Sequence, residues 1–152
     1  MITVEEIGIE KSQLVLDMVG KLLDELADDQ SAHVFLNHDR IRHYWEQNQD
    51  RFTTFVAMGE NDLPLGMVTV IESFAIYADG AYGVINELYV QPEFRGKSIG
   101  KMLLQTVKEY GSMRNWERID VTTPPGEKWQ RAETFYERED FVHTGPKMKF
   151  LY

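Results

Sequence analysis

The chain has 152 residues, of which 43% are hydrophobic and 12% aromatic, so it is long enough and apolar enough to bury one core. Its 16 basic and 25 acidic residues give a net charge of −9, which argues against general nucleic-acid binding because phosphate neutralisation needs a basic surface. The absence of cysteine excludes disulfides, thiolate metal sites and a cysteine nucleophile.

The sequence also bears on location and domain number. No stretch approaches the roughly 18 apolar residues that a membrane span needs, and the acidic start MITVEEIGIE is unlike a signal peptide. We therefore expect a single cytoplasmic domain over residues 1–152, with neither a membrane nor a nucleic acid as partner.

The first 91 residues are predicted to form one strand, two helices and three further strands. Alternating apolar and polar residues predict a strand over 1–9, and apolar side chains at helical spacing predict helices over 11–27 and 39–49. Further strands are predicted over 52–58, 65–77 and 82–91, with turns at 59–62 and 79–80 between them.

The rest of the chain is predicted to form two helices and three strands. The helices are expected over 98–112 and 127–138, and the strands over 119–123 and, twice, within 141–152. Because this order mixes hairpins with crossovers, we expect an α+β fold with a mixed, mainly antiparallel sheet of six to seven strands flanked by helices.

The most informative segment is the loop predicted between the strand over 82–91 and the helix that follows it. Free backbone N–H groups at a helix start, together with the helix dipole, make an anion site. The loop has small residues that let phosphate oxygens approach closely: Gly96, Ser98 and Gly100. It also has three basic residues with no acidic residue between them: Arg95, Lys97 and Lys101. The alternative is a helix start capped by Ser98, with surface charge unrelated to a ligand.

The tripeptide Gly96-Lys97-Ser98 invites comparison with a nucleotide-binding P-loop. A P-loop has a glycine five positions before its Gly-Lys pair, and that position is Gln91 here. Hydrolysis of nucleoside triphosphates is therefore not predicted.

Residues 90–100 resemble the signature of the GNAT superfamily of acyl-CoA N-acyltransferases. The pattern Arg/Gln-x-x-Gly-x-Gly/Ala is matched by Arg95 and Gly100, with Ser98 in place of the central glycine. A second family element, Ala-x-x-Phe-Tyr followed by Gly-Phe, is matched by residues 132–136 and by Phe141, with Asp140 in place of glycine. Many members carry asparagine where this chain has Trp129.

The resemblance implies how acetyl-CoA would bind. The end of the strand over 82–91 would separate from its neighbour at a bulge and pair its backbone with the pantetheine arm, and the loop would hold the pyrophosphate. The first strand and two helices would form one wall of the acceptor site. The cofactor-binding residues implied are Leu88, Tyr89, Val90, Arg95, Gly96, Lys97, Ser98, Ile99, Gly100 and Lys101.

Acyl transfer to an amine needs a neutral nucleophile, a polarised thioester carbonyl and a proton for the departing thiolate. Glu87 is the candidate base, directly or through water, and its alternative reading is a carboxylate paired or solvated on the sheet. Tyr136 is the candidate acid, because the family places a tyrosine there beside the sulfur; otherwise its ring packs on the sheet. A backbone N–H at or near Leu88 would polarise the carbonyl.

Other polar clusters have simpler readings. No metal is predicted, because His33, His38 and His43 are spaced by five residues and do not stack on one helix face. Four acidic residues at the end of the first helix form either a solvated face or a surface that attracts a cationic acceptor: Asp24, Glu25, Asp28 and Asp29.

These observations together predict an N-acetyltransferase that moves the acetyl group of acetyl-CoA to a primary amine. Transfer would occur by direct attack in a ternary complex, and the net negative charge favours a small cationic acceptor. Two alternatives stay open: a non-catalytic acyl-CoA-binding or sensing domain, and a protein or peptide N-acetyltransferase. A homodimer is compatible with the sequence.

Overall fold

The computed structural model describes residues 1–27, 35–124 and 126–152, in two compact units, Met1–Asp120 and Val121–Tyr152. The expectation of one domain over residues 1–152 stays a prediction.

The first unit is built on an antiparallel sheet that follows chain order. Strands β1 (Thr3–Glu6), β2 (Phe52–Met58), β3 (Pro64–Ala75) and β4 (Gly80–Val90) each pair with the next, and β5 (Ile119–Val121) follows β4 in the sheet. A turn that contains Gly59 joins β2 to β3, and a turn over 76–79 leads into Gly80, the first residue of β4, so short turns make adjacent strands form hairpins.

Strand β5 begins alongside the first half of β4 and runs in the same direction. Glu117 N–H donates to Ala81 O, and further along both segments Gly83 N–H donates to Arg118 O. The sheet is therefore mixed, with one parallel neighbour at its edge. Because β5 has 3 residues and β4 has 11, β5 is too short to pair with the last residues of β4.

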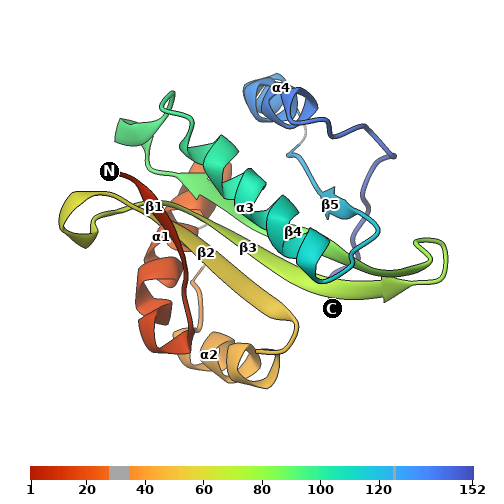
Figure 1. Cartoon of the computed structure of the whole chain (residues 1–152), viewed down its shortest axis with the longest axis horizontal. Coiled ribbons are helices and arrows are strands. Elements are labelled where there is room, and N and C mark those ends of the chain that lie inside the picture. The colour runs from red at the N-terminus through yellow and green to blue at the C-terminus, as the bar shows by residue number, and fades with distance from the viewer. Residues whose placement is uncertain (28–34, 125) are drawn as a thin grey trace. The chain divides into compact units, whose positions relative to one another are not determined.

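Helices cover both faces of the sheet in the first unit. Helices α1 (Ser12–Leu26) and α2 (His38–Gln47) lie on one face and α3 (Ile99–Met113) on the other (Figure 1). On the α1 face, Val15 and Met18 pack with Val56 and Met67 in the core. On the opposite face, Tyr110 OH lies 3.0 Å from Thr53 Oγ1, so odd-numbered side chains of β2 point towards α3.

The second unit contains α4 (Gln130–Arg138) and the chain that follows it. The two strands expected within 141–152 are not observed, since residues 141–152 have no regular secondary structure. The alternating side chains of this segment are exposed instead, with Met148 at 91% and Phe150 at 80%. That prediction is wrong, because alternation indicates a strand only where a neighbouring strand is available to pair with it.

The fold class is confirmed: a mixed, mainly antiparallel sheet flanked by helices, with five strands in the described part of the chain in place of the expected six to seven. Among the described residues, no helix is long and apolar enough to cross a membrane.

Candidate functional site

A β-bulge in β4 decides which way Glu87 points. Thr69 pairs with Glu87, but the next residue of β3, Val70, pairs with Ile85, so Asn86 is an extra residue with no partner. Without the bulge, Ile85 and Glu87 would face the same side of the sheet. With it, Ile85 stays on the α3 face while Glu87 joins the α1 face.

Glu87 is half-buried beside Thr69, and that residue is its hydrogen-bond partner. The Thr69 hydroxyl donates to the Glu87 carboxylate and accepts from the Glu87 backbone N–H at 3.1 Å. Burial raises the pKa of Glu87 above its ordinary value, and the Thr69 hydrogen bond opposes part of that rise. A carboxyl group with a raised pKa holds a proton more strongly and is a better general base near neutral pH.

The end of β4 presents backbone groups at an edge that β5 does not reach. Gln91 N–H donates to Leu65 O in β3, and Glu87 N–H also points towards β3. Because successive N–H groups of a strand point in opposite directions, those of Leu88 and Val90 point to the other edge. Val90 O points there too and accepts a hydrogen bond from Arg95 Nε at 2.8 Å.

The loop after β4 leads directly into the start of α3. Gly96 and Ser98 both adopt the left-handed conformation, with φ of 79° and 64°, and α3 begins at Ile99. The first hydrogen bond of the helix is donated by Met102 N–H to Ser98 O. Within the described chain, no hydrogen bond uses the N–H groups of the six residues before Met102: Gly96, Lys97, Ser98, Ile99, Gly100 and Lys101.

The loop therefore fits a pyrophosphate. A run of free N–H groups at the start of a 15-residue helix gives donors and a favourable dipole for an anion. A Cβ at Gly96 would meet nothing within 4 Å, but φ of 79° makes any L side chain strained there. Ser98 occupies the N-cap position of α3 but makes no capping hydrogen bond with its side chain, which counts against the alternative reading of this loop as a serine-capped helix start.

Two positions where the family pattern has glycine share the backbone conformation that favours glycine. Ser98 and Asp140 both lie in the left-handed region, with φ of 64° and 70°. Asp140 lies two residues after α4 ends at Arg138, and Phe141 N–H then donates back to Tyr136 O at 3.0 Å. An L-residue in this conformation costs about 1 kcal/mol, less for aspartate, so the two substitutions retain the left-handed backbone at a modest cost.

Arg95 forms an ion pair with Glu25 of α1, which the sequence did not indicate. Its guanidinium donates to both oxygens of Glu25, at 2.8 and 3.0 Å, and lies over the ring of Tyr89. A second bridge joins Lys21 Nζ to Gln91 Oε1 at 3.0 Å. The charge of Arg95 is therefore paired, and its role in this structure is to fix the loop against α1.

Tyr136 lies on α4 in the second unit and is 9% exposed. Its ring makes edge contacts with Phe135 and Phe141, at centroid distances of 5.2 and 5.5 Å. Burial raises its pKa to about 12. The phenol therefore keeps its proton throughout the neutral range and is present as a hydrogen-bond donor.

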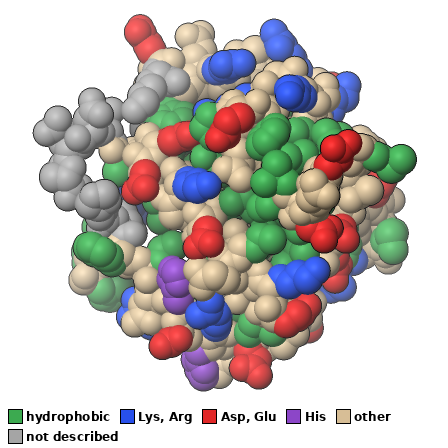
Figure 2. Space-filling view, turned by 90° about the vertical axis from the view of Figure 1, so that its left-hand side faces the viewer, with side chains coloured by type: hydrophobic (Ala, Val, Ile, Leu, Met, Phe, Trp, Pro, Cys, Tyr) green, Lys and Arg blue, Asp and Glu red, His purple; other side chains and the backbone are tan. Residues whose placement is uncertain are grey.

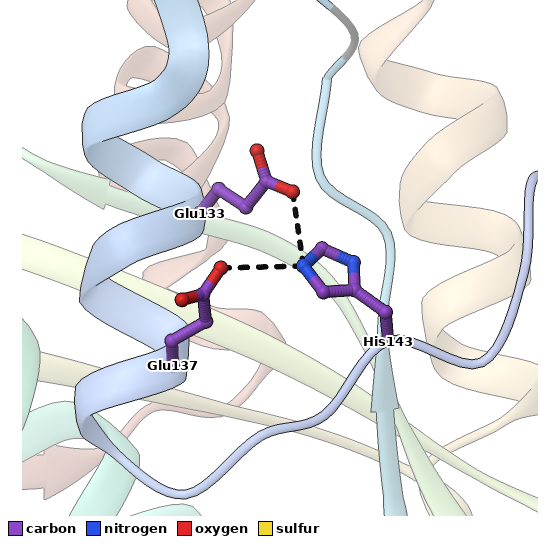
Figure 3. A group of neighbouring side chains, drawn as sticks. All are labelled: Glu133, Glu137 and His143. Carbon is purple, nitrogen blue, oxygen red and sulfur yellow. Dashed lines mark hydrogen bonds and ion pairs between the residues drawn. The ribbon is translucent and has the colours of Figure 1, made fainter.

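Two glutamates of the same helix form a small cluster with His143, which lies in the chain after the helix. His143 Nε2 lies 3.0 Å from Glu133 and 3.2 Å from Glu137, which are one turn apart on α4 (Figure 3). Their ligand atoms all lie within 4.8 Å of one another. All three side chains are exposed or nearly so, and the contacts of the two carboxylates with His143 Nε2 account for their arrangement without a metal. Of the histidines considered for a metal, His33 lies outside the described residues.

A surface hollow of ≈ 320 Å³ adjoins α1 and the start of α2. Its walls include two acidic side chains, Asp17 and Asp24, and one basic side chain, Lys21. Acidic and basic side chains are interspersed over the face drawn in Figure 2, so no single-sign field covers that face. Asp28 and Asp29 of the predicted acidic cluster lie outside the described residues.

Comparison with known sequences identifies the family. The sequence profile of the acetyltransferase (GNAT) family matches residues 20–141. An uncharacterized N-acetyltransferase of Archaeoglobus fulgidus is 37% identical over 67 residues, which cover 44% of this chain and 44% of that protein. The match thus spans less than half the length of this curated relative.

Comparison with solved structures shows the same fold. An aminoglycoside acetyltransferase from an uncultured soil sample has a TM-score of 0.81 at 17% identity, covering 100% of this chain and 99% of its own. A predicted acetyltransferase of Clostridium acetobutylicum, solved with acetyl-CoA, has a TM-score of 0.79 at 14% identity, covering 99% and 96%. At such identities the likeness establishes the fold alone. Because the family profile covers well over half of the sequence, the chain belongs to the GNAT family of acetyltransferases.

Proposed function

We propose that this protein transfers the acetyl group of acetyl-CoA to a primary amine of a small cationic molecule. The observation that carries the proposal is the continuity of β4 with the loop and α3. The strand offers backbone groups at an edge that β5 does not reach, and about six residues later the chain offers free N–H groups to an anion. A long thioester with a pyrophosphate at its far end is complementary to this order of groups.

Two residues of the first unit, Leu88 and Glu87, would take part in the chemical steps of the transfer. When bound, acetyl-CoA supplies an activated acetyl thioester. Leu88 N–H, at the open edge, would donate to the thioester carbonyl oxygen and stabilise the negative charge that develops there. Glu87, one residue earlier, would take the proton of the acceptor ammonium directly or through water, because a free alkyl amine with a pKa near 10.4 is mostly protonated at neutral pH.

Tyr136 would serve the departing sulfur. A thiol has a pKa of about 8.5, well below the pKa of about 12 that burial gives Tyr136. Relative to a thiol with its reference pKa in water, complete proton transfer from the phenol to the thiolate is therefore uphill. Hydrogen bonding from the phenol O–H to the sulfur is the role that the pKa supports, with the proton supplied finally by solvent.

Tyr136→Phe tests that role, because it removes only the hydroxyl group. We expect acetyl-CoA binding to persist and turnover to fall by about 10²-fold, the lower end for loss of a proton donor. Steady-state kinetics at fixed pH would measure both values. Phe135→Leu, on the same helix, is the control for altered packing. A near-normal rate in Tyr136→Phe would show that the phenol makes no hydrogen bond that stabilises the departing sulfur.

The acceptor is inferred from charge and from the surface along α1. Asp17 and Asp24 line the hollow there, and the chain has a net charge of −9. A second aminoglycoside acetyltransferase from an uncultured soil sample, similar in fold with a TM-score of 0.77 at 17% identity, was solved in complex with sisomicin, and aminoglycosides carry several amino groups. Attraction by acidic side chains would raise the encounter rate of a cation at low ionic strength.

An acetylation screen tests the proposed function. Thiol release from acetyl-CoA would be measured with polyamines, aminoglycosides, amino acids and peptides, at low and at high salt. We expect turnover with a cationic small amine, a rate that falls with salt, and intersecting initial-rate patterns for a ternary complex. Cofactor-dependent melting shifts without turnover on any amine would favour a sensor, and turnover on peptides alone would favour a protein acetyltransferase.

A further inference from the structure

Three polar side chains lie in register across the centre of the sheet. Thr54 of β2 pairs with Thr69 of β3, which pairs with Glu87 of β4, so all three point to the α1 face. Thr54 is fully buried and Thr69 is 2% exposed. Their neighbours in the core on this face are apolar, so the row stands out as the polar part of that layer.

The two threonines of this row are not equivalent. Thr69 contacts Glu87 twice: its hydroxyl donates to the carboxylate and accepts from the backbone N–H on the carboxyl side of the bulge. A single hydroxyl thus fixes both the backbone and the side chain of one residue. The Thr54 hydroxyl has no hydrogen-bond partner within the described chain, although it is equally buried.

Other charged groups packed against this face are engaged elsewhere. On α1, Lys21 donates to Gln91, and Glu25 is paired with Arg95. On β4 itself, the nearest titratable side chain on the same face is Tyr89, which lies in the core under Arg95. Burial raises the pKa of Glu87, and of the surrounding side chains only the Thr69 hydroxyl lowers it.

We propose that Thr69 is the positioning residue of the candidate base, holding the Glu87 carboxylate and the bulge beside it in one fixed arrangement. This inference rests on the proposed function, in which Glu87 takes the proton of the acceptor amine. Thr69 touches no reacting atom. It acts by orienting Glu87 at the edge of β4 where the thioester would lie, and by stabilising the ionised form of the carboxyl group.

The test compares Thr69→Val with Thr54→Val, which is the same change at an equally buried site in the same row. The pKa of Glu87 would be followed by ¹³C NMR of glutamate-labelled protein, with its signal assigned through Glu87→Gln. In Thr69→Val we expect the pKa of Glu87 and the acidic limb of kcat/KM to rise together by about one pH unit. We also expect kcat to fall about tenfold with the KM for acetyl-CoA unchanged.

The controls separate positioning from packing. Thr54→Val should leave the pKa of Glu87 and the rate unchanged, and Thr69→Ser, which keeps the hydroxyl, should restore both. If Thr69→Val does not fold, Thr69→Ala is measured in the same assays. If the pKa of Glu87 is the same in Thr69→Val and Thr54→Val while Glu87→Gln is inactive, the positioning role of Thr69 is overturned. The role of Glu87 as the base would then stand. A fully active Glu87→Gln variant would overturn the base itself, and the positioning role with it.

Discussion

Glu87→Gln is expected to lower turnover by about 10²- to 10⁴-fold, the range for loss of a general base, and to leave acetyl-CoA binding intact. The amide keeps the size of the side chain and can still hydrogen-bond to Thr69, but it cannot accept the acceptor's proton. Kinetics over a range of pH would measure the effect. Glu60→Gln, an exposed position in the turn between β2 and β3, is the matched control for a lost negative charge.

The pH dependence gives this experiment a second readout. Because burial raises the pKa of Glu87, the wild-type rate should fall as the pH drops through a value above the ordinary glutamate range, and the variant should lose this limb. A raised pKa in the folded state stabilises the protein only at low pH, and this contribution is lost as the pH rises through the folded pKa. At neutral pH the variant should therefore be at least as stable as wild type. Wild-type turnover in Glu87→Gln would contradict the assignment.

Most secondary structure up to Arg138 was predictable, because burial there follows the local sequence pattern. The strand Phe52–Met58 has the predicted bounds, and the apolar stripe on α1 is the face that packs in the core. The pattern failed after Phe141. Alternation of Met148, Phe150 and Tyr152 has the period of a strand, but a strand also needs a partner, which the local sequence does not specify.

The candidate site was predictable only in its local parts. The sequence indicated a loop with small residues before a helix, and the structure confirms this local arrangement. The resemblance implied a bulge in this strand but did not place it at Asn86, because its position depends on the register between β3 and β4, which decides which face Glu87 occupies. Thr69 gave one weak signal, as a polar residue inside an apolar strand. The pairing of Arg95 with Glu25 joins residues 70 positions apart, which no local pattern reveals.

Gly100→Glu is expected to weaken acetyl-CoA binding by about 10²-fold or more. The free N–H groups cluster at this helix start, and each lost hydrogen bond to a charged group costs about 1.5–3 kcal/mol. Gly100 is the second residue of α3, where the new carboxylate would compete with the pyrophosphate for these N–H groups and repel its charge. A negative charge in the first turn also favours the helix dipole, so the variant should fold normally and its loss of affinity would not reflect unfolding.

Two controls divide the loss between charge and bulk. Gly100→Gln has nearly the same size without the charge and should lose less affinity, whereas Gln105→Glu adds the same charge to an exposed site further along α3 and should bind almost normally. Calorimetric titration with acetyl-CoA at low and at high salt would measure all three variants. If charge repulsion dominates, salt should recover part of the affinity of Gly100→Glu but not that of Gly100→Gln. Unchanged affinity in a folded Gly100→Glu variant would show that the pyrophosphate lies elsewhere, and the loop after β4 would then have no part in binding.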